Sequence, residues 1–356
     1  MSFNHKRELE ELLSLVLVEL NNNKLYKSVS NHGPLEINAF SITFWIDLIG
    51  ETSVSRVYIK IPRYIIYDKD INSLASLSEA DRVLAEDEYK SLNFLSDNWD
   101  TSYGVSFVKP LAYIEKYRAI VTEGIEGNFF FESFRRANFY RKFKGNQLDS
   151  VNVGLNNLGK SLYVFHSQSA VETTFKAKEI FPKINQYCDF LKECGVGYKF
   201  LTRALKTFSK YQDFECSSIV VNSLKGIDIR QIFINQEEVL EIIDPGKMFK
   251  SFREVDLARF IVTCRILYWG TWLIFFKIVP NQNYEEIFLK GYYDSKKPEK
   301  ILYFLIIKEF FKQWKMGHKG ILKKEWPRFF KYLVKKLYLD PFYKGVIYLE
   351  FSRLES

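Results

Sequence analysis

The chain has few of the residues that build metal sites and disulfide frameworks. It contains only four cysteines and four histidines in 356 residues. No two cysteines stand at the C-x-x-C spacing and no histidine stands at metal-ligand distance from them, so the sequence predicts neither a zinc site nor a disulfide framework. A cytoplasmic protein with reduced thiols is expected. The cysteines are Cys188, Cys194, Cys216 and Cys264.

A long apolar run and a secretion signal are also lacking. The most apolar segment, residues 260–279, includes Arg265 and Lys277, so it offers no clean span of ~20 apolar residues and is expected to be a buried helix. The first ten residues are charged and lead into an amphipathic pattern, unlike the short basic region and apolar block of a signal peptide. We therefore expect a protein that is not secreted.

Aromatic residues and positive charge are abundant. The aromatic share is 17%, with 32 Phe and 22 Tyr, which predicts cores packed largely by aromatic rings. The formal net charge of +8 favours anionic partners, among them nucleotides, phosphorylated substrates, nucleic acid and acidic lipid surfaces. The charge alone does not choose among these partners.

The hydrophobic pattern changes from strand-like to helical near residues 123–130. Before this point it predicts a leading helix at residues 7–22 and a hairpin of two strands, 35–48 and 53–62, that turns at Gly50. A helix capped by Ser78 and Asp81 is expected at residues 76–95, followed by two more strands at 105–113 and 117–122. Beyond it, helical periodicity is interrupted by short strands at 231–234 and 239–243. We divide the chain into a leading segment, a sheet-rich lobe, a helical lobe and basic aromatic helices, at residues 1–34, 35–127, 128–300 and 301–356.

Two charged residues stand at places where strands could use them. An apolar run at residues 239–243 places Asp244 on a Pro-Gly turn, where a carboxylate suits a cation, although a solvated turn residue is the commoner case. Strand alternation places Lys60 on the face opposite Ile59 and Ile61, where a lysine is normally solvated. Their meaning depends on the rest of the chain.

The order of these parts resembles the aminoglycoside phosphotransferase and choline kinase-like superfamily over roughly residues 40–280. The matching phrases are Val57-Tyr58-Ile59-Lys60, residues 88–95 beginning at Glu88, residues 121–127 from Val121 to Gly127, residues 158–166 ending at His166, Ile243-Asp244-Pro245-Gly246, and Asp256-Leu257-Ala258-Arg259-Phe260. The resemblance implies an α+β, bilobal protein kinase-like fold with a sheet-rich N-lobe and a mainly helical C-lobe. We expect His166 to be a satisfied or capping residue.

The resemblance also implies ATP and Mg²⁺ as cofactors. Lys60 would grip the nucleotide phosphates while Glu88 holds its side chain, and Asp244 with Gln231 would hold the metal. The connector residues Thr122, Glu123 and Ile125 would offer backbone groups to the edge of the adenine.

The catalytic loop departs from the superfamily pattern. When Gln231 is placed in the metal-binding amide position, Gly226 stands where the catalytic Asp belongs. Asp228 could act as the catalytic Asp only if the loop is shortened. Lys225 or Arg230 would then neutralise the transferred phosphate. The phosphate-covering turn, assigned to residues 50–55, has one glycine. Two accounts stay open: a small-molecule kinase that phosphorylates a hydroxyl, most plausibly of a sugar or saccharide-like acceptor, and a pseudokinase that serves as a nucleotide-binding scaffold or regulator.

Residues 308–344 interleave lysines with aromatic side chains. In a helix, Trp326, Phe329, Phe330 and Leu333 would share one face. The favoured interpretation has the aromatics docked on the helical lobe and the lysines in water. A surface-lying helix at an anionic membrane is the second interpretation, which would give a peripheral position at the inner face of a membrane. Nucleic-acid binding is the third and the least expected.

Overall fold

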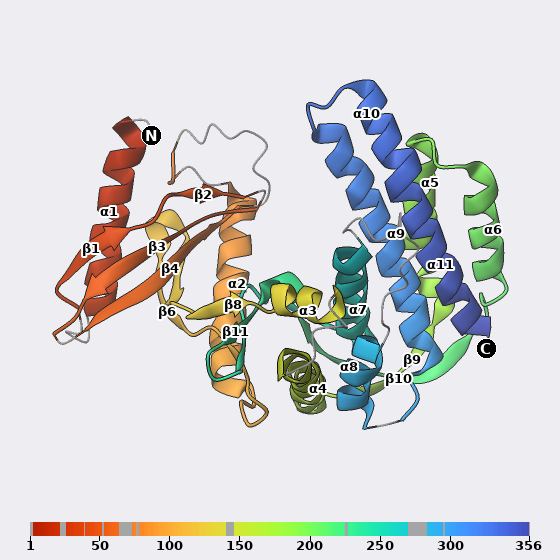
Figure 1. Cartoon of the computed structure of the whole chain (residues 1–356), viewed down its shortest axis with the longest axis horizontal. Helices are drawn as coiled ribbons and strands as arrows, with labels where there is room; N and C mark the ends of the chain where they lie inside the picture. Colours follow the sequence, from red (N-terminus) through yellow and green to blue (C-terminus); the bar gives the residue numbers. More distant parts are fainter. Residues whose placement is uncertain are drawn as a thin grey trace. The chain divides into compact units, whose positions relative to one another are not determined.

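The computed structural model describes most of the chain, and Figure 1 labels most of its helices and strands. The described residues are 3–21, 26–38, 40–51, 53–63, 73–75, 78–139, 146–224, 227–269, 283–294 and 296–355. The chain divides into two compact units. The first comprises Met1–Glu132, Leu224–Gly226 and Arg230–Met248, and the second comprises Ser133–Ser223, Ile227–Ile229 and Phe249–Ser356.

The first unit is built on an antiparallel sheet with the order β1-β3-β4-β7-β6, in which β2 also pairs with β3. The strands are β1 (Ser28–His32), β2 (Glu36–Ile37), β3 (Ser41–Ile49), β4 (Val54–Pro62), β6 (Pro110–Ile114) and β7 (Ala119–Glu123), with a 3-10 turn, η2 (Glu115–Tyr117), between the last two. Alternate residues of β3 and β4, including Ile46 and Ile59, pack with α1 (Phe3–Leu20) in one core. The expected leading helix and hairpin are therefore present.

The other face of this sheet meets α2 (Glu79–Asn98). Ser78 and Asp81 form the expected capping box at its start, and Leu92 of α2 packs with Val108 and with Ile120 of β7. Because Ile120 pairs with Lys60 and paired residues point to the same side, α2 covers the face that carries Lys60.

A second, smaller sheet completes the first unit, in the order β5-β12-β11-β8. Its strands are β5 (Val105–Phe107), β8 (Gly127–Phe129), β11 (Ile232–Asn235) and β12 (Leu240–Ile242), with the 3-10 turn η4 (Ile229–Gln231) just before β11. The single strand expected at residues 105–113 is wrong. The chain there forms two strands that belong to different sheets, because β5 pairs with β12 while β6 pairs with β7.

The second unit is mainly helical. Its helices are α3 (Phe130–Phe139, whose first turn lies in the first unit), α4 (Asn146–Ser167), α5 (Phe181–Glu193), α6 (Tyr198–Ser209), α7 (Glu254–Trp269), α8 (Asn283–Tyr293), α9 (Lys300–Lys323), α10 (Arg328–Leu333) and α11 (Asp340–Glu355). A π-helical segment, η6 (Val334–Leu339), joins α10 to α11. A three-stranded sheet consists of β9 (Val171–Lys176), β10 (Glu215–Leu224) and β13 (Met248–Phe252), and η3 (Ala177–Glu179) follows β9.

Two glycines allow α4 and α8 to touch through their backbones. A Cβ added at Gly159 would lie 2.3 Å from the carbonyl oxygen of Phe288, and one at Gly291 would lie 2.1 Å from that of Asn156. Larger residues at either position would push the two helices apart.

The expected buried helix at residues 260–279 is present as far as the structure describes it. Phe260, Ile261 and Cys264 of α7 are buried, and residues 270–279 lie outside the described residues. No helix in the described ranges is long and apolar enough to span a bilayer.

The charged residue in that helix is a structural centre of the second unit. Arg265 is buried, with Nη1 2.6 Å from Glu350 of α11 and Nη2 2.6 Å from Glu285 of α8. Removing one member of a buried charge group leaves the others desolvated and uncompensated. Arg265 therefore joins α7, α8 and α11.

We expect Arg265→Met to lower the free energy of unfolding by about 3–5 kcal/mol, because both glutamates stay buried without their main cation. Urea unfolding followed by circular dichroism measures the change. Arg353→Met is the matched control, since Arg353 reaches the same two acids from a more exposed position and is expected to contribute about 1 kcal/mol or less. Equal unfolding midpoints for Arg265→Met and the unsubstituted chain would contradict this role.

Candidate functional site

Three side chains from distant parts of the first unit meet at one point. Lys60 Nζ of β4 lies 2.6 Å from Glu88 Oε1 of α2 and 2.8 Å from Asp244 Oδ1, which follows β12. The exposed fractions of the three side chains are 21%, 5% and 35%. The solvated lysine that the strand pattern alone would favour is therefore excluded, and Asp244 is the member of the group most open to solvent.

The group carries two carboxylates against one ammonium. Burial raises the pKa of the Glu88 carboxyl to about 7; the charge of Lys60 opposes this rise and that of Asp244 adds to it. Burial lowers the pKa of Lys60, but the attraction of the two carboxylates outweighs it and the pKa lies above its ordinary value. A surplus of buried negative charge favours either a proton on Glu88 or a further cation near Asp244.

The backbone at Asp244 is in the left-handed region, with φ 55°, and Gly246 follows with φ 65°. A residue other than glycine adopts this conformation at some cost, which Asp and Asn bear best. Such outliers concentrate at ligand-binding sites. The turn is therefore consistent with a carboxylate held in place for a ligand.

Gln231 adds an amide to this site. Its Nε2 donates a hydrogen bond to Asp244 Oδ2 at 3.0 Å, while its Oε1 is buried without a hydrogen-bond partner among the described residues. Among all the residues that the structure describes, no three His, Cys, Asp or Glu side chains lie close enough together to hold a metal ion by themselves. Mg²⁺ commonly takes only one or two protein ligands and completes its shell with phosphate oxygens and water. The orphaned amide oxygen beside Asp244 fits such a partial site.

Tyr58 and Trp45 share the sheet face of Lys60. Tyr58 lies two residues before Lys60 in β4, and Trp45 is its partner in β3. Arg56, on the same face, lies 4.0 Å above the Trp45 ring and donates to Asp47 at 2.8 Å. These side chains were not among the expected site residues, although the alternation that placed Lys60 also places Tyr58.

The connector is held against the sheet by its own backbone. Glu123 donates its N–H to the carbonyl of Lys109 at 3.0 Å, and Gly124 donates to that of Arg56 at 2.9 Å. These two N–H groups are used within the protein and do not face a ligand. Thr122 pairs with Tyr58 and so points to the Lys60 face, whereas Glu123 pairs with Val57 and points to the opposite one. Ile125 packs against the cluster of Leu92, Val108 and Ile120.

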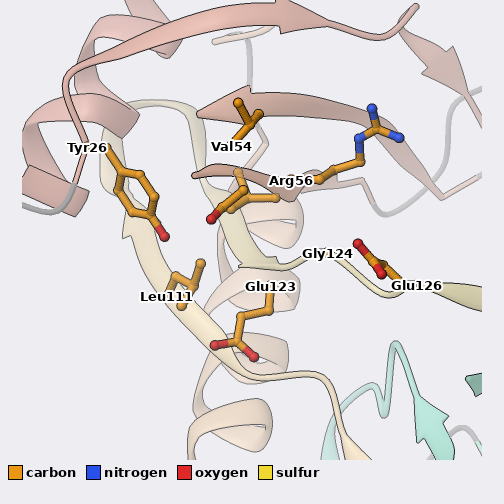
Figure 2. A pocket seen from close by; sticks show the side chains of 9 residues that line it. Tyr26, Val54, Arg56, Leu111, Glu123, Gly124 and Glu126 are labelled. Atoms are coloured by element: carbon orange, nitrogen blue, oxygen red, sulfur yellow. The ribbon is translucent and has the colours of Figure 1, made fainter. Parts of the chain in front are cut away.

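A pocket of about 330 Å³ opens beside the connector (Figure 2). Tyr26, Val57, Leu111 and Glu123 are among its lining residues. Val57 and Glu123 point away from Lys60, whereas Arg56, which also lines the pocket, lies on the Lys60 face, so the pocket is at the connector end of β4. Neither Lys60, Glu88 nor Asp244 is among its lining residues.

The expected catalytic residues lie in different surroundings. Asp228, in the second unit, is only 3% exposed, and its Oδ2 lies 3.7 Å from Arg259 Nη2. Arg259 in turn contacts Glu309 of α9. Arg230 is exposed within η4, and Lys225 lies outside the described residues. Sequence reasoning missed Arg259 as a partner of Asp228, although it stands in the Asp-Leu-Ala phrase of α7.

A buried polar cluster lies at the end of β10, just before the expected catalytic loop. His166 Nδ1 is 2.7 Å from the Tyr292 hydroxyl and its Nε2 is 3.1 Å from Asp256 Oδ2, while Ser223 donates to Asp256 Oδ1 at 2.8 Å. Both ring nitrogens of His166 have partners, which confirms that it is a satisfied residue.

No model of a known protein family matches the sequence, and comparison with curated proteins finds no match. Solved structures do match. Choline kinase LicA from Streptococcus pneumoniae aligns with a TM-score of 0.51 and 11% identity, covering 96% of this chain and 99% of that one. Spectinomycin phosphotransferase APH(9)-Ia, in complex with ADP and spectinomycin, aligns with a TM-score of 0.51 and 14% identity, over 97% and 98%. Macrolide 2'-phosphotransferase MphH from Brachybacterium faecium aligns with a TM-score of 0.51 and 11% identity, over 88% and 92%.

This chain has the kinase-like fold. The expected α+β class, with a sheet-rich first part and a mainly helical second part, is confirmed. The likeness covers nearly the whole length of the kinase-like enzymes that it matches.

One expectation about the kinase-like sheet is wrong. The turn at Gly50 cannot cover phosphates held by Lys60, because Lys60 pairs with Thr43, seven residues away along β3, or roughly 24 Å. The connection at the Lys60 end of the hairpin is residues 33–40, between β1 and β3. There Gly33 lies so close to Trp45 that an added Cβ would be 2.3 Å from the indole nitrogen.

We expect Glu88→Gln to flatten the pH dependence of stability. Because the pKa of Glu88 is raised from 4.5 to about 7 on folding, its stabilising contribution is complete below pH 4.5 and is lost as the pH rises through about 7. The unsubstituted chain should lose on the order of 3 kcal/mol over this range, and Glu88→Gln should not. Urea midpoints measured between about pH 5 and pH 8 test this.

Glu86→Gln is the matched control, since Glu86 lies in the same helix and contacts Arg82. It should keep the pH dependence of the unsubstituted chain. Parallel curves for Glu88→Gln and the unsubstituted chain would show that Glu88 is not the titrating group.

Proposed function

We propose that this chain binds ATP with Mg²⁺ and transfers a phosphoryl group to a hydroxyl of a small molecule, a sugar or saccharide-like acceptor. The observation that carries the proposal is the contact of Lys60 with both Glu88 and Asp244. The fold supports it, since the three solved structures described above, each with a TM-score of 0.51, are named as kinases or phosphotransferases of choline, spectinomycin and macrolides.

The residues of the first unit have distinct tasks in this proposal. Glu88 is buried and keeps Lys60 in one rotamer, so that the ammonium is aimed at nucleotide phosphates. Asp244 is more exposed, so its carboxylate can leave Lys60 and bind a metal ion instead. Gln231 Oε1 would be the second protein ligand of that ion. Mg²⁺ would supply charge neutralisation at the phosphates.

The purine ring of a nucleotide bound between Lys60 and the connector would contact the side chain of Tyr58. Tyr58 pairs with Thr122 and is 39% exposed, so its ring can stack on a purine. The N–H groups of Glu123 and Gly124 are used inside the sheet, which leaves other backbone groups between Thr122 and Ile125 for the base edge.

Asp228 is the proposed base for the acceptor hydroxyl, with Lys225 or Arg230 neutralising the transferred phosphate. Arg259, itself held by Glu309, holds the Asp228 carboxylate in one orientation. A base must come within hydrogen-bond reach of the proton that it removes.

The second candidate function is a catalytically impaired pseudokinase that binds nucleotide as a scaffold or regulator. The burial of Asp228, at 3% exposure, favours this account, because an acceptor hydroxyl has little access to it. Nucleotide binding is common to both candidates, and turnover separates them.

Nucleotide binding should stabilise the chain against heat only when Mg²⁺ is present with ATP or GTP. Lys60→Met should weaken binding by at least about tenfold, since a charge-assisted hydrogen bond to phosphate is lost, and Asp244→Asn should remove the Mg²⁺ dependence. Thermal-shift titration and calorimetry measure both. Lys90→Met, at an exposed position of α2, is the control. Failure of every purine nucleotide with Mg²⁺ to raise the melting temperature would end the proposal.

Turnover of ATP should appear with one member of a panel of sugars, amino alcohols and lipid-linked saccharides. Asp228→Asn should then lower kcat by about 10² to 10⁴ with unchanged nucleotide affinity, because only proton transfer is affected. Asp213→Asn, at an exposed position, is the control. Unchanged kcat in Asp228→Asn would show that the base is another residue, and nucleotide binding without turnover on any acceptor would favour the scaffold.

A further inference from the structure

The helical hairpin at the C-terminal end of the chain has an exposed tip, formed by the end of α9, the loop that follows it, and α10. Helices α9 and α11 pack side by side, and the loop and α10 lie at one end of the pair (Figure 1). Every residue from Leu322 to Phe330 is exposed. The favoured expectation that the aromatics of residues 308–344 dock on the helical lobe holds for the buried Phe310, Phe311 and Trp314. It is wrong for Trp326, Phe329, Phe330 and Tyr332, which are exposed.

The exposed side chains at this tip are apolar to an unusual degree. The exposed fractions are 39% for Trp326, 72% for Phe329, 46% for Phe330, 57% for Tyr332 and 59% for Leu337. Leu322 and Met316 on the last turns of α9 are also exposed. Trp326 lies in the loop before α10 rather than in a helix, and its ring contacts Phe330 at 5.1 Å between centroids. Exposed apolar side chains gathered in one segment, rather than scattered singly over the surface, are a feature of interaction sites.

The same segment carries most of the net charge of the chain. Residues 315–337 contain eight lysines and arginines against one glutamate, in a chain whose formal net charge is +8. They are Lys315, Lys319, Lys323, Lys324, Arg328, Lys331, Lys335 and Lys336. This charge favours an anionic partner.

The tip is already ordered for binding. Lys331 Nζ donates to the carbonyl of Leu322 at 3.0 Å, which links α10 to the end of α9. Below the tip, the buried Asp340 carboxylate accepts from Trp314 Nε1 at 3.0 Å and lies 2.8 Å from His318 Nε2. Docking this surface needs little further ordering, which favours affinity.

We propose that residues 315–337 dock on an anionic lipid bilayer, with Trp326, Phe329 and Phe330 at the headgroup level and the exposed Lys324 and Arg328 among the lipid phosphates. Aromatic and basic side chains combined on one short amphipathic segment are the features of helices that lie in a membrane interface. The proposal is independent of nucleotide binding.

Two other partners fit this surface less well. A second copy would bring the same eight basic residues face to face, and like charges oppose association. Nucleic acid would favour arginine forks at phosphates and bases, whereas seven of the eight basic residues here are lysines, and the exposed Leu322 and Leu337 have no stacking role.

Sedimentation of the full chain with vesicles tests the proposal. We expect binding to vesicles that contain phosphatidylserine at low salt, weaker binding at high salt, and little binding to pure phosphatidylcholine. Phe329→Ser with Phe330→Ser, and separately Lys324→Glu with Arg328→Glu, should each weaken binding by at least about tenfold, since each basic residue near an anionic surface contributes roughly fivefold. Circular dichroism checks that these exposed substitutions leave the fold intact.

Matched controls change the same properties elsewhere. Lys199→Glu with Lys206→Glu alters the net charge equally at exposed positions of α6, and Val18→Ser with Val171→Ser removes apolar side chains that are 61% and 59% exposed. Both should bind as the unsubstituted chain does. No binding at low salt, equal binding by the tip variants, or equal binding to neutral vesicles would each overturn the proposal. A dimer that the Phe variants dissociate, or retention by single-stranded nucleic acid, without vesicle binding would assign the surface to that partner instead.

Discussion

The contact of one lysine with two acids is the constraint on which the first unit depends. Lys60, Glu88 and Asp244 come from a strand, a helix and a turn that are far apart in sequence. Charges taken out of water must be paired, so these three elements have to be held in register. The sheet core under α1 and the capping box of α2 provide that support, and the second sheet carries the turn of Asp244.

The acid of the expected catalytic loop, Asp228, is also paired with a cation, but it is more deeply buried than Asp244. Asp244 is 35% exposed and can exchange partners, whereas Asp228 is 3% exposed and faces Arg259, which Glu309 holds. A site can therefore be well formed for nucleotide while the acid of its loop is enclosed. Binding and chemistry are separate questions in this chain, and they depend on different residues.

The C-terminal hairpin combines a rigid base with an exposed end. Burial alone would raise the pKa of Asp340, but hydrogen bonds from His318 and Trp314 lower it below its ordinary range. Trp314 also stacks on Tyr343 at 5.7 Å between ring centroids. This packing uses the aromatic residues nearest the core, while those a few residues further on have no core to enter. The exposed tip is a consequence of where the α9 and α11 contact ends.

The sequence by itself determined the elements whose signals are local. Strand alternation placed Lys60, the Ser78–Asp81 spacing marked the start of α2, and the Pro-Gly turn marked Asp244. The order of these phrases indicated the kinase-like fold. Local signals act within a few residues, so they carry over from sequence to structure.

Only the tertiary structure decided which side chains meet. Strand pairing showed that the Gly50 turn lies far from Lys60 and that residues 105–113 divide between two sheets. Packing decided that Arg259 faces Asp228 and that Trp326, Phe329 and Phe330 stay in water. Register, burial and ion pairing depend on residues distant in the chain, and a periodic pattern gives the face of a side chain but not what covers that face.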